Sequence, residues 1–396
     1  MISVQEAKKI ILQNTVDFGI EEIPFIESVG RVLKETIVAD RDFPPFNRVA
    51  MDGIAINFSY FKNEQRNFTI EAVQPAGSKQ LTMQNSANCI EVMTGAVLPN
   101  NCDTVIRYED VVIENGVATI TVNTINNKQN IHTKGKDKIK GAQLIKENTI
   151  ISPAEIGVIA TVGKSTIKVA KQPKVMIIST GDELVGVDEN PLKHQIRRSN
   201  VYTLVSLLNK LYIPSKTDHI TDNKEVLKNK INGYLKEYDV LLFSGAVSKG
   251  KFDFLPEVLN ELGVEKLFHK VAQRPGKPFW MGQTNTCKVF AFPGNPVSTF
   301  VNCLVYFYQW YYKSVNVKQP EETAILANDM VFKPNLTYFL QVKLSYRFGH
   351  LIATPIKGNG SGDLVSLVEA DGFIEISKTE QIEFKSGTVF PVIRYK

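Results

Sequence analysis

The sequence predicts a multi-domain protein with a central α/β domain whose sheet is mostly parallel. N-terminal helical and β modules and a small C-terminal β domain are expected on either side of it. Three observations favour this fold class. The chain has 396 residues, which is more than one hydrophobic core usually serves. Residues 173–312 alternate strand-like apolar runs with amphipathic helices, the pattern of a parallel sheet. Outside that range the periodicity changes to short β-branched alternation.

The two flanking regions are bounded by these changes in pattern. The N-terminal region is expected over residues 1–170 and the C-terminal β domain over 320–396. A first helix begins after Ser3, where Glu6 completes a capping box. We expect the N-terminal region to comprise a helical part at 1–45 and 145–170 and an inserted β module at about 46–144.

The central domain is expected over residues 171–316. Val175–Ile178 is a continuous apolar run, as in a strand that is buried on both faces. One helix is expected after Ser199 and a second from Asp222, and the next strand is Val240–Phe243. This alternation predicts parallel strands joined by right-handed crossovers.

Composition excludes several classes of protein. The net charge of +5 is far from the basic excess of a nucleic-acid-binding protein. The N-terminus lacks the features of a signal peptide, and no apolar run approaches the roughly 20 residues of a membrane helix. A cytoplasmic protein is therefore expected. The cysteines form no C-x-x-C pair and the histidines are dispersed, so any metal is expected to be Mg²⁺ on carboxylates. The cysteines are Cys89, Cys102, Cys287 and Cys303.

Ligands of open parallel sheets bind outside the carboxyl ends of the strands, and this rule selects four turns of the central domain. In the first turn, Thr180 and Gly181 precede the adjacent carboxylates Asp182 and Glu183. Such carboxylates coordinate Mg²⁺ together with waters and substrate phosphate. The alternative is that they only complement the positive end of a helix.

The second turn fits the phosphate-binding pattern G-x-x-x-x-G-K from Gly245 to Lys251. The following position should be Ser or Thr to hold magnesium, but it is Phe252. The sequence therefore favours a phosphate site here and argues against a Walker-type ATPase. The alternative is that Gly and Ser only shape the turn. The polar residues of this turn are Ser244, Ser248 and Asp253.

The third and fourth turns carry cations and a helix start. Arg274 and Lys277 flank a Pro-Gly turn that would place them for an oxyanion, unless they are simply solvated. In the fourth turn, Pro293–Ser298, Asn295 suits a helix N-cap and Pro296 the first helical position. Together the four turns predict a polyphosphorylated, metal-bridged ligand.

Several motifs in fixed order resemble one family. PPFNRVAMDG from Pro44 to Gly53 resembles the PPFDxSAMDGYA segment of the MoeA family, the molybdopterin molybdenumtransferases. STGDEL, SGAVSKGKFDF, RPGKPFWMG and FPGNPVS resemble its central signatures, and the tail is similar to its GS…SL…ANG pattern. The likeness spans nearly the whole chain, and the C-terminal part of gephyrin belongs to the same family.

The resemblance implies an enzyme of molybdenum cofactor synthesis. It would insert molybdate into adenylylated molybdopterin and release AMP, with Mg²⁺ as cofactor. The implied protein is an elongated homodimer with a barrel-like C-terminal domain, in which the N-terminal module of one subunit faces the central domain of the other. Implied partners are a molybdopterin adenylyltransferase and molybdoenzymes or cofactor-carrier proteins.

Residue roles follow from the same resemblance, and Asp222 is equally explained as a helix N-cap. The implied catalytic residues are Asp52, Glu183, Asp253 and Lys277. The implied metal ligands are Glu183, Asp222 and Asp253. The implied cofactor-binding residues are Thr94, Asp137, Thr180, Gly181, Ser244, Gly245, Ser248, Arg274, Pro293, Asn295, Pro296 and Ser298.

The chain also departs from the family pattern. Asn47 and Val49 replace an acid and a hydroxyl, and Lys136 adds a cation where an acid is common. Leu336 and Gln341 stand in place of two arginines, which removes an expected anion contact from the C-terminal domain. Two alternative functions stay open: a molybdopterin adenylyltransferase and a gephyrin-like scaffold without catalysis.

Overall fold

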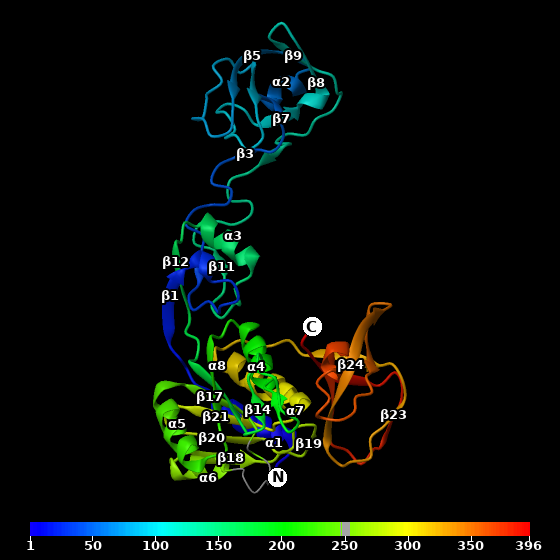
Figure 1. Ribbon diagram of the computed structural model, residues 1–396. Coiled ribbons are helices and arrows are strands. Elements are labelled where there is room, and N and C mark those ends of the chain that lie inside the picture. The colour runs from blue at the N-terminus through cyan, green and yellow to red at the C-terminus, as the bar shows by residue number, and fades with distance from the viewer. Residues whose placement is uncertain (246, 248–253) are drawn as a thin grey trace.

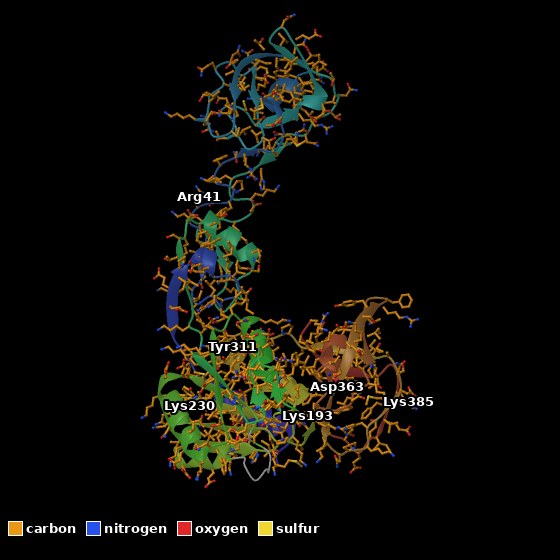
Figure 2. All side chains as sticks on the ribbon, in the orientation of Figure 1. Arg41, Lys193, Lys230, Tyr311, Asp363 and Lys385 are labelled. Carbon is orange, nitrogen blue, oxygen red and sulfur yellow. The ribbon has the colours of Figure 1, made fainter. Side chains whose placement is uncertain are left out.

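The computed structural model describes residues 1–245, 247 and 254–396. Figure 1 shows an elongated chain with a β module at one end, a small α/β unit in the middle, and the central and C-terminal domains side by side at the other end. Arg41 lies where the chain narrows between the β module and the middle unit (Figure 2). The expected multi-domain, elongated architecture agrees with this arrangement.

The middle unit is built from segments that precede and follow the β module. Strand β1 (Ile20–Pro24) pairs antiparallel with β12 (Thr166–Ala170), and β2 (Ile37–Val38) pairs with β11 (Gln143–Ile145). Helix α3 (Pro153–Thr161) begins with a capping box at Ser152 and packs on these strands. The β module is therefore inserted into the sequence of the middle unit, between β2 and β11.

The inserted β module contains a six-stranded sheet of order β7-β4-β6-β5-β9-β8. Beside it, β3 (Arg48–Val49) pairs antiparallel with β10 (Ile131–His132). The strands of the sheet are β4 (Gly53–Ile56), β5 (Asn67–Gln74), β6 (Cys89–Val92), β7 (Thr104–Arg107), β8 (Val111–Glu114) and β9 (Val117–Ile120), and helix α2 (Phe58–Lys62) follows β4.

The first helix, α1 (Val4–Gln13), has the capping box between Ser3 and Glu6 that the sequence predicts. Its buried face joins the core of the central domain instead of the middle unit, and the indole N–H of Trp310 donates to the carbonyl of Asn14 at 3.0 Å. From its position in the sequence, this helix was expected in the N-terminal region. An amphipathic pattern shows that a helix has an apolar face but not which core that face will join.

The central sheet has the order β16-β13-β17-β21-β20-β18. Its first four strands run parallel. At the other edge, β20 (Trp280–Gln283) pairs antiparallel with β21 and β18 (Glu265–His269) pairs antiparallel with β20, so the prediction of a mostly parallel sheet is confirmed. The parallel strands are β13 (Val175–Thr180), β16 (Ser215–Ile220), β17 (Val240–Ser244) and β21 (Lys288–Phe292).

Helices cover both faces of this sheet, which explains the continuous apolar run of β13. Val175 and Ile177 belong to one core, with α4 (Asn200–Asn209), whereas Met176 and Ile178 belong to the other, with α5 and α6. Helix α5 is Lys224–Glu237 and α6 is Leu255–Glu261. On the first face, α7 (Pro296–Asn302), the π-helix η3 (Cys303–Phe307) and α8 (Tyr308–Ser314) follow one another without interruption.

The C-terminal domain is a closed five-stranded barrel, which confirms the barrel-like prediction. The order β24-β25-β22-β28-β26 is closed by pairing of β26 back onto β24. Strand β19 (Gln273–Arg274) leaves the central domain and pairs with the start of β24, so the barrel is attached next to the third predicted turn. The remaining elements are β22 (Glu322–Leu326), β23 (Met330–Val331), β24 (Thr337–Arg347), β25 (His350–Pro355), α9 (Ser366–Glu369), β26 (Gly372–Ile376), β27 (Glu383–Phe384) and β28 (Val389–Arg394).

Candidate functional site

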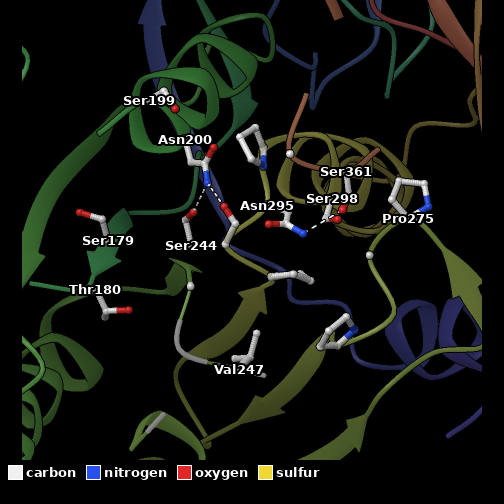
Figure 3. A pocket seen from close by; sticks show the side chains of 18 of the residues that line it. Ser179, Thr180, Ser199, Asn200, Ser244, Val247, Pro275, Asn295, Ser298 and Ser361 are labelled. Carbon is white, nitrogen blue, oxygen red and sulfur yellow. Dashed lines mark hydrogen bonds between the residues drawn. The ribbon is translucent and has the colours of Figure 1, made fainter. Parts of the chain in front are cut away.

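A cleft of about 860 Å³ opens at the carboxyl ends of the parallel strands, and residues from all four predicted turns line it. The turns converge because the ends of β13, β17 and β21 are neighbours in the sheet and β19 leads the third turn beside them (Figure 3). The predicted residues that line the cleft are Thr180, Gly181, Glu183, Asp222, Ser244, Gly245, Arg274, Lys277, Pro293, Asn295, Pro296 and Ser298. Ser248 and Asp253 lie outside the described residues.

The first and second turns meet at the hydroxyl of Thr180. This oxygen is buried and has no hydrogen-bond partner among the residues that the structure describes. Gly245 lies against it with φ +111°, and a Cβ there would stand 3.2 Å from Thr180 Oγ1. A buried hydroxyl without a partner is costly unless a ligand or water completes it. Thr180 is therefore placed to contact a bound molecule.

Two described carboxylates, Glu183 and Asp222, line the same cleft. The predicted capping role of Asp222 is wrong, because the N-cap of α5 is Asn223, whose Oδ1 accepts from the N–H groups of Glu225 and Val226. The backbone N–H of Asp222 instead donates to Asp182 Oδ1 at 3.0 Å, which joins the first turn to the start of α5. Within the described part of the chain, no group of three or more potential metal ligands is clustered.

Four cations line the cleft, of which the sequence analysis identified two. Neither Arg274 nor Lys277 forms an ion pair with a residue that the structure describes. The sequence did not point to the other two, Arg197 and Arg198. Arg197 ends the short strand β15 (Ile196–Arg197), which pairs parallel with β14 (Leu184–Val185), and Arg198 is the next residue. Their adjacency immediately before a predicted helix start was the available signal. Cations outnumber the described carboxylates in the cleft, which favours a polyanionic ligand.

Hydrogen bonds between distant segments hold the cleft together (Figure 3). Asn200, at the start of α4, donates from Nδ2 to Ser244 Oγ at 2.9 Å and to the carbonyl of Gly294 at 2.7 Å. Asn295 occupies the predicted N-cap position of α7, and Pro296 follows as expected. The side chain of Asn295 does not cap the helix, because its Nδ2 donates to Ser361 Oγ of the C-terminal domain at 2.8 Å.

Neutral contacts stand at the two positions of the C-terminal domain where the family resemblance implies arginines. Leu336 lines the cleft with an apolar side chain, together with Ser361 and Gly362. Gln341 is buried and exchanges hydrogen bonds with Ser366 Oγ, at 3.0 and 3.1 Å. The C-terminal domain therefore contributes polar and apolar contacts to this cleft, and no arginine at these positions.

Asp52, Thr94 and Asp137 do not line this cleft, because they belong to the β module at the far end of the same chain (Figure 1). The backbone N–H of Thr94 donates to Asp52 Oδ1 at 2.6 Å, and this hydrogen bond lowers the pKa of Asp52. Asp137 Oδ1 lies 2.8 Å from His132 Nε2.

Three departures from the family pattern also lie in the β module, and Val49 is one of them, buried in strand β3. Asn47 Oδ1 accepts from the backbone N–H of Lys134 at 2.9 Å, which anchors the neighbouring loop, and Lys136 is exposed.

None of the helices in the described part of the chain has the length and apolar character needed to cross a membrane.

The fold and the cleft define a multi-domain protein whose α/β domain carries a cleft lined by cations. Residues 2–163 match the family model of the MoeA N-terminal region (domain I and II), residues 176–309 that of a probable molybdopterin binding domain, and residues 323–395 that of the MoeA C-terminal region (domain IV).

Known proteins agree with these matches over most or all of their length. The chain is 40% identical to a molybdopterin molybdenumtransferase of Synechocystis sp. over 396 residues, covering 99% of each. It is 29% identical to the molybdopterin molybdenumtransferase of Bacillus subtilis, covering 94% of this chain and 89% of that protein. The solved molybdopterin biosynthesis moeA protein of Pyrococcus horikoshii OT3 has 27% identity and a TM-score of 0.84, with 100% of both chains covered. The chain belongs to the MoeA family, which confirms the resemblance.

Proposed function

We propose that this protein is a molybdopterin molybdenumtransferase of molybdenum cofactor biosynthesis. It would take adenylylated molybdopterin and molybdate as substrates and release AMP. The observation that carries this proposal is the convergence of four turns on one cleft with four lining cations: Arg197, Arg198, Arg274 and Lys277. The relatives that carry the name molybdopterin molybdenumtransferase support it.

Each turn has a chemical task in this proposal. Lys277 and Arg274 hold molybdate, because exposed cations without ion-pair partners in the described chain are available to an oxyanion. Thr180 donates its buried hydroxyl to a phosphate oxygen of the pterin nucleotide, beside the backbone of Gly245. The protein thus accelerates the reaction by positioning two anions and by stabilising charge.

Mg²⁺ fits the donors that line the cleft. Glu183 and Asp222 offer carboxylate oxygens, and no histidine or cysteine of the described chain lines the cleft. Oxygen ligands of this kind suit Mg²⁺, which usually takes one or two carboxylates plus waters and substrate phosphate. When bound, Mg²⁺ would neutralise phosphate charge, and Asp253 is the further ligand that the family resemblance implies.

A homodimer would bring the separated site residues together. Asp52, Thr94 and Asp137 belong to the β module, which Figure 1 shows at the opposite end of the molecule from the central domain, so the β module of a second copy is proposed to cover the cleft. Mixing Asp52→Ala and Asp253→Ala subunits, each expected to be inactive alone, tests this, because a hybrid dimer with composite sites has one intact site. Random mixing should then recover about a quarter of the wild-type rate, as expected for a symmetric dimer. Mixtures without any recovery would contradict it.

The proposed reaction is tested directly with the purified protein. Adenylylated molybdopterin, molybdate and Mg²⁺ should yield AMP, and omission of molybdate or Mg²⁺ should stop its release. Formation of adenylylated pterin from molybdopterin and ATP would instead support the adenylyltransferase. Asp253→Ala should lose turnover while staying folded, whereas a scaffold would keep its full function. Adenylyltransferase and carrier partners, and a cytoplasmic location, are proposed with the same activity.

A further inference from the structure

The third turn of the cleft rests on a buried polar network that its proposed oxyanion role does not explain. The side chain of Gln273 donates from Nε2 to the carbonyl of Pro275 and to Asn302 Oδ1, both at 2.8 Å. Its Oε1 accepts the hydroxyl of Tyr306. Asn302 Nδ2 in turn donates to the carbonyl of Gly276 at 3.3 Å. The backbone of the turn is thus held by side chains on its inner side.

This network is fully enclosed in the protein. Gln273 is 1% exposed, and Asn302 and Tyr306 are each 0% exposed. Burial raises the pKa of Tyr306 well above its ordinary value, so its hydroxyl stays protonated and donates. Polar side chains in a core are costly unless they are satisfied, and a satisfied network fixes a single geometry. An apolar core would be the simpler way to stabilise this fold.

The network determines which way the peptide groups of the turn face. In a trans peptide the C=O and the following N–H point in opposite directions. Because the carbonyls of Pro275 and Gly276 point to Gln273 and Asn302, the N–H groups of Gly276 and Lys277 point away from the network. Neither N–H donates to another group in the described part of the chain. Both residues line the cleft.

Gly276 shows how closely the network packs on the turn. Its φ is +91°, and a Cβ there would stand 2.7 Å from both Asn302 Oδ1 and Gln273 Nε2. The two amides therefore lie directly against its Cα, and the turn has no room to shift toward them.

The network also connects the third turn to two other parts of the site. Asn302 ends α7, the helix that begins at the fourth turn, and Tyr306 lies in the π-helix η3 that follows. Insertions of π-helix into α-helices occur frequently at functional sites. Gln273 itself pairs with Thr337 at the start of barrel strand β24.

We propose that Gln273, Asn302 and Tyr306 are positioning residues that aim the N–H groups of Gly276 and Lys277 into the cleft as oxyanion donors beside the Lys277 cation. The inference rests on the proposed function for the identity of the anion, molybdate. The donors are fixed before the anion arrives, so the site does not have to reorganise when molybdate binds.

Tyr306→Phe tests the proposal, with Tyr308→Phe as its matched control. Both variants remove one tyrosine hydroxyl from the same helical segment, and Tyr308 donates to the carbonyl of Leu207 at 2.6 Å, away from the turn. The readout is the dissociation constant of inorganic molybdate for the full-length protein, measured by titration calorimetry. It should rise about three- to tenfold in Tyr306→Phe, as for loss of one hydrogen bond, and stay unchanged in Tyr308→Phe.

A second variant, Gln273→Met, removes all the bonds of the central amide at nearly constant volume and should weaken molybdate binding further. In the AMP-release assay, half-saturating molybdate should rise while half-saturating pterin nucleotide does not. Equal molybdate affinity in wild type, Tyr306→Phe and Gln273→Met would overturn the positioning role, as would a wild-type protein that does not bind molybdate. A wild type that binds molybdate without releasing AMP refutes the proposed reaction instead.

Discussion

Replacing Lys277 by methionine removes one cation from the cleft while keeping nearly the length of the side chain. Lys277 is exposed, lines the cleft and has no ion-pair partner in the described part of the chain, so its charge is available to a bound anion. Hydrogen bonds to charged groups contribute about 1.5–3 kcal/mol, and solvent exposure places this one near the lower limit. A loss of about 1.5 kcal/mol corresponds to about a tenfold higher half-saturating molybdate concentration.

The assay is AMP release at saturating adenylylated molybdopterin with molybdate varied, followed by the reverse titration. Half-saturating pterin nucleotide should change much less than half-saturating molybdate, because the nucleotide also contacts the first and second turns in the proposed site. Lys266→Met is the matched control, since Lys266 is an exposed lysine of the same domain that does not line the cleft.

Two results would refute this reasoning. Equal weakening of molybdate and pterin nucleotide in Lys277→Met would show that the cation does not mark the oxyanion position. The same response in Lys266→Met would show that the effect comes from the net charge of the domain and not from a placed cation.

Three further predictions concern the site and the core. Gly181→Ala should raise half-saturating Mg²⁺ severalfold in the AMP-release assay, because a Cβ there would stand 2.4 Å from Glu183 Oε2 and displace the carboxylate, and φ +127° adds strain. Unfolding free energy, measured with urea, should fall below about pH 6.5, because burial and then Arg198 lower the pKa of His219 and the native protein binds fewer protons than the unfolded chain. His219→Gln should flatten this slope, whereas His194→Gln, at an exposed position, should not. A thiol reagent at about pH 8 should modify no cysteine in the native protein and all four after denaturation, because burial raises the pKa of the thiols. Burial raises the pKa of Cys89, Cys102 and Cys287 to about 12, and it also raises the pKa of Cys303 above its ordinary range.

The sequence predicts best those strands and helices whose residues share one environment, such as complete burial. All residues of β13 are buried, so its apolar run is visible in the sequence. The residues of β16 do not predict a strand, because only Ile220 of the six is buried and the strand lies at the edge of the sheet. A polar edge strand is specified by its neighbour's hydrogen-bonding groups more than by its own side chains.

The site was predictable to the extent that strand ends converge. Once β13, β17 and β21 are parallel neighbours, their turns share one edge of the sheet whatever residues they carry. The network of Gln273, Asn302 and Tyr306 was not predictable, because isolated polar residues beside an apolar helix carry no sign of their mutual contact.

The contacts that complete the cleft all join segments far apart in the chain. Asn200 is separated by 44 residues from Ser244 and by 94 from Gly294, and Asn295 by 66 from Ser361. Local periodicity does not predict such pairs, because these hydrogen bonds form only when the domains have packed against one another. Asn295 illustrates this: its position at the helix start follows from the local sequence, but its amide bonds the barrel instead of capping α7. The placement of the barrel is therefore part of the geometry of the site, and changes at the barrel contact of Asn295 should alter the cleft without touching any of its cations.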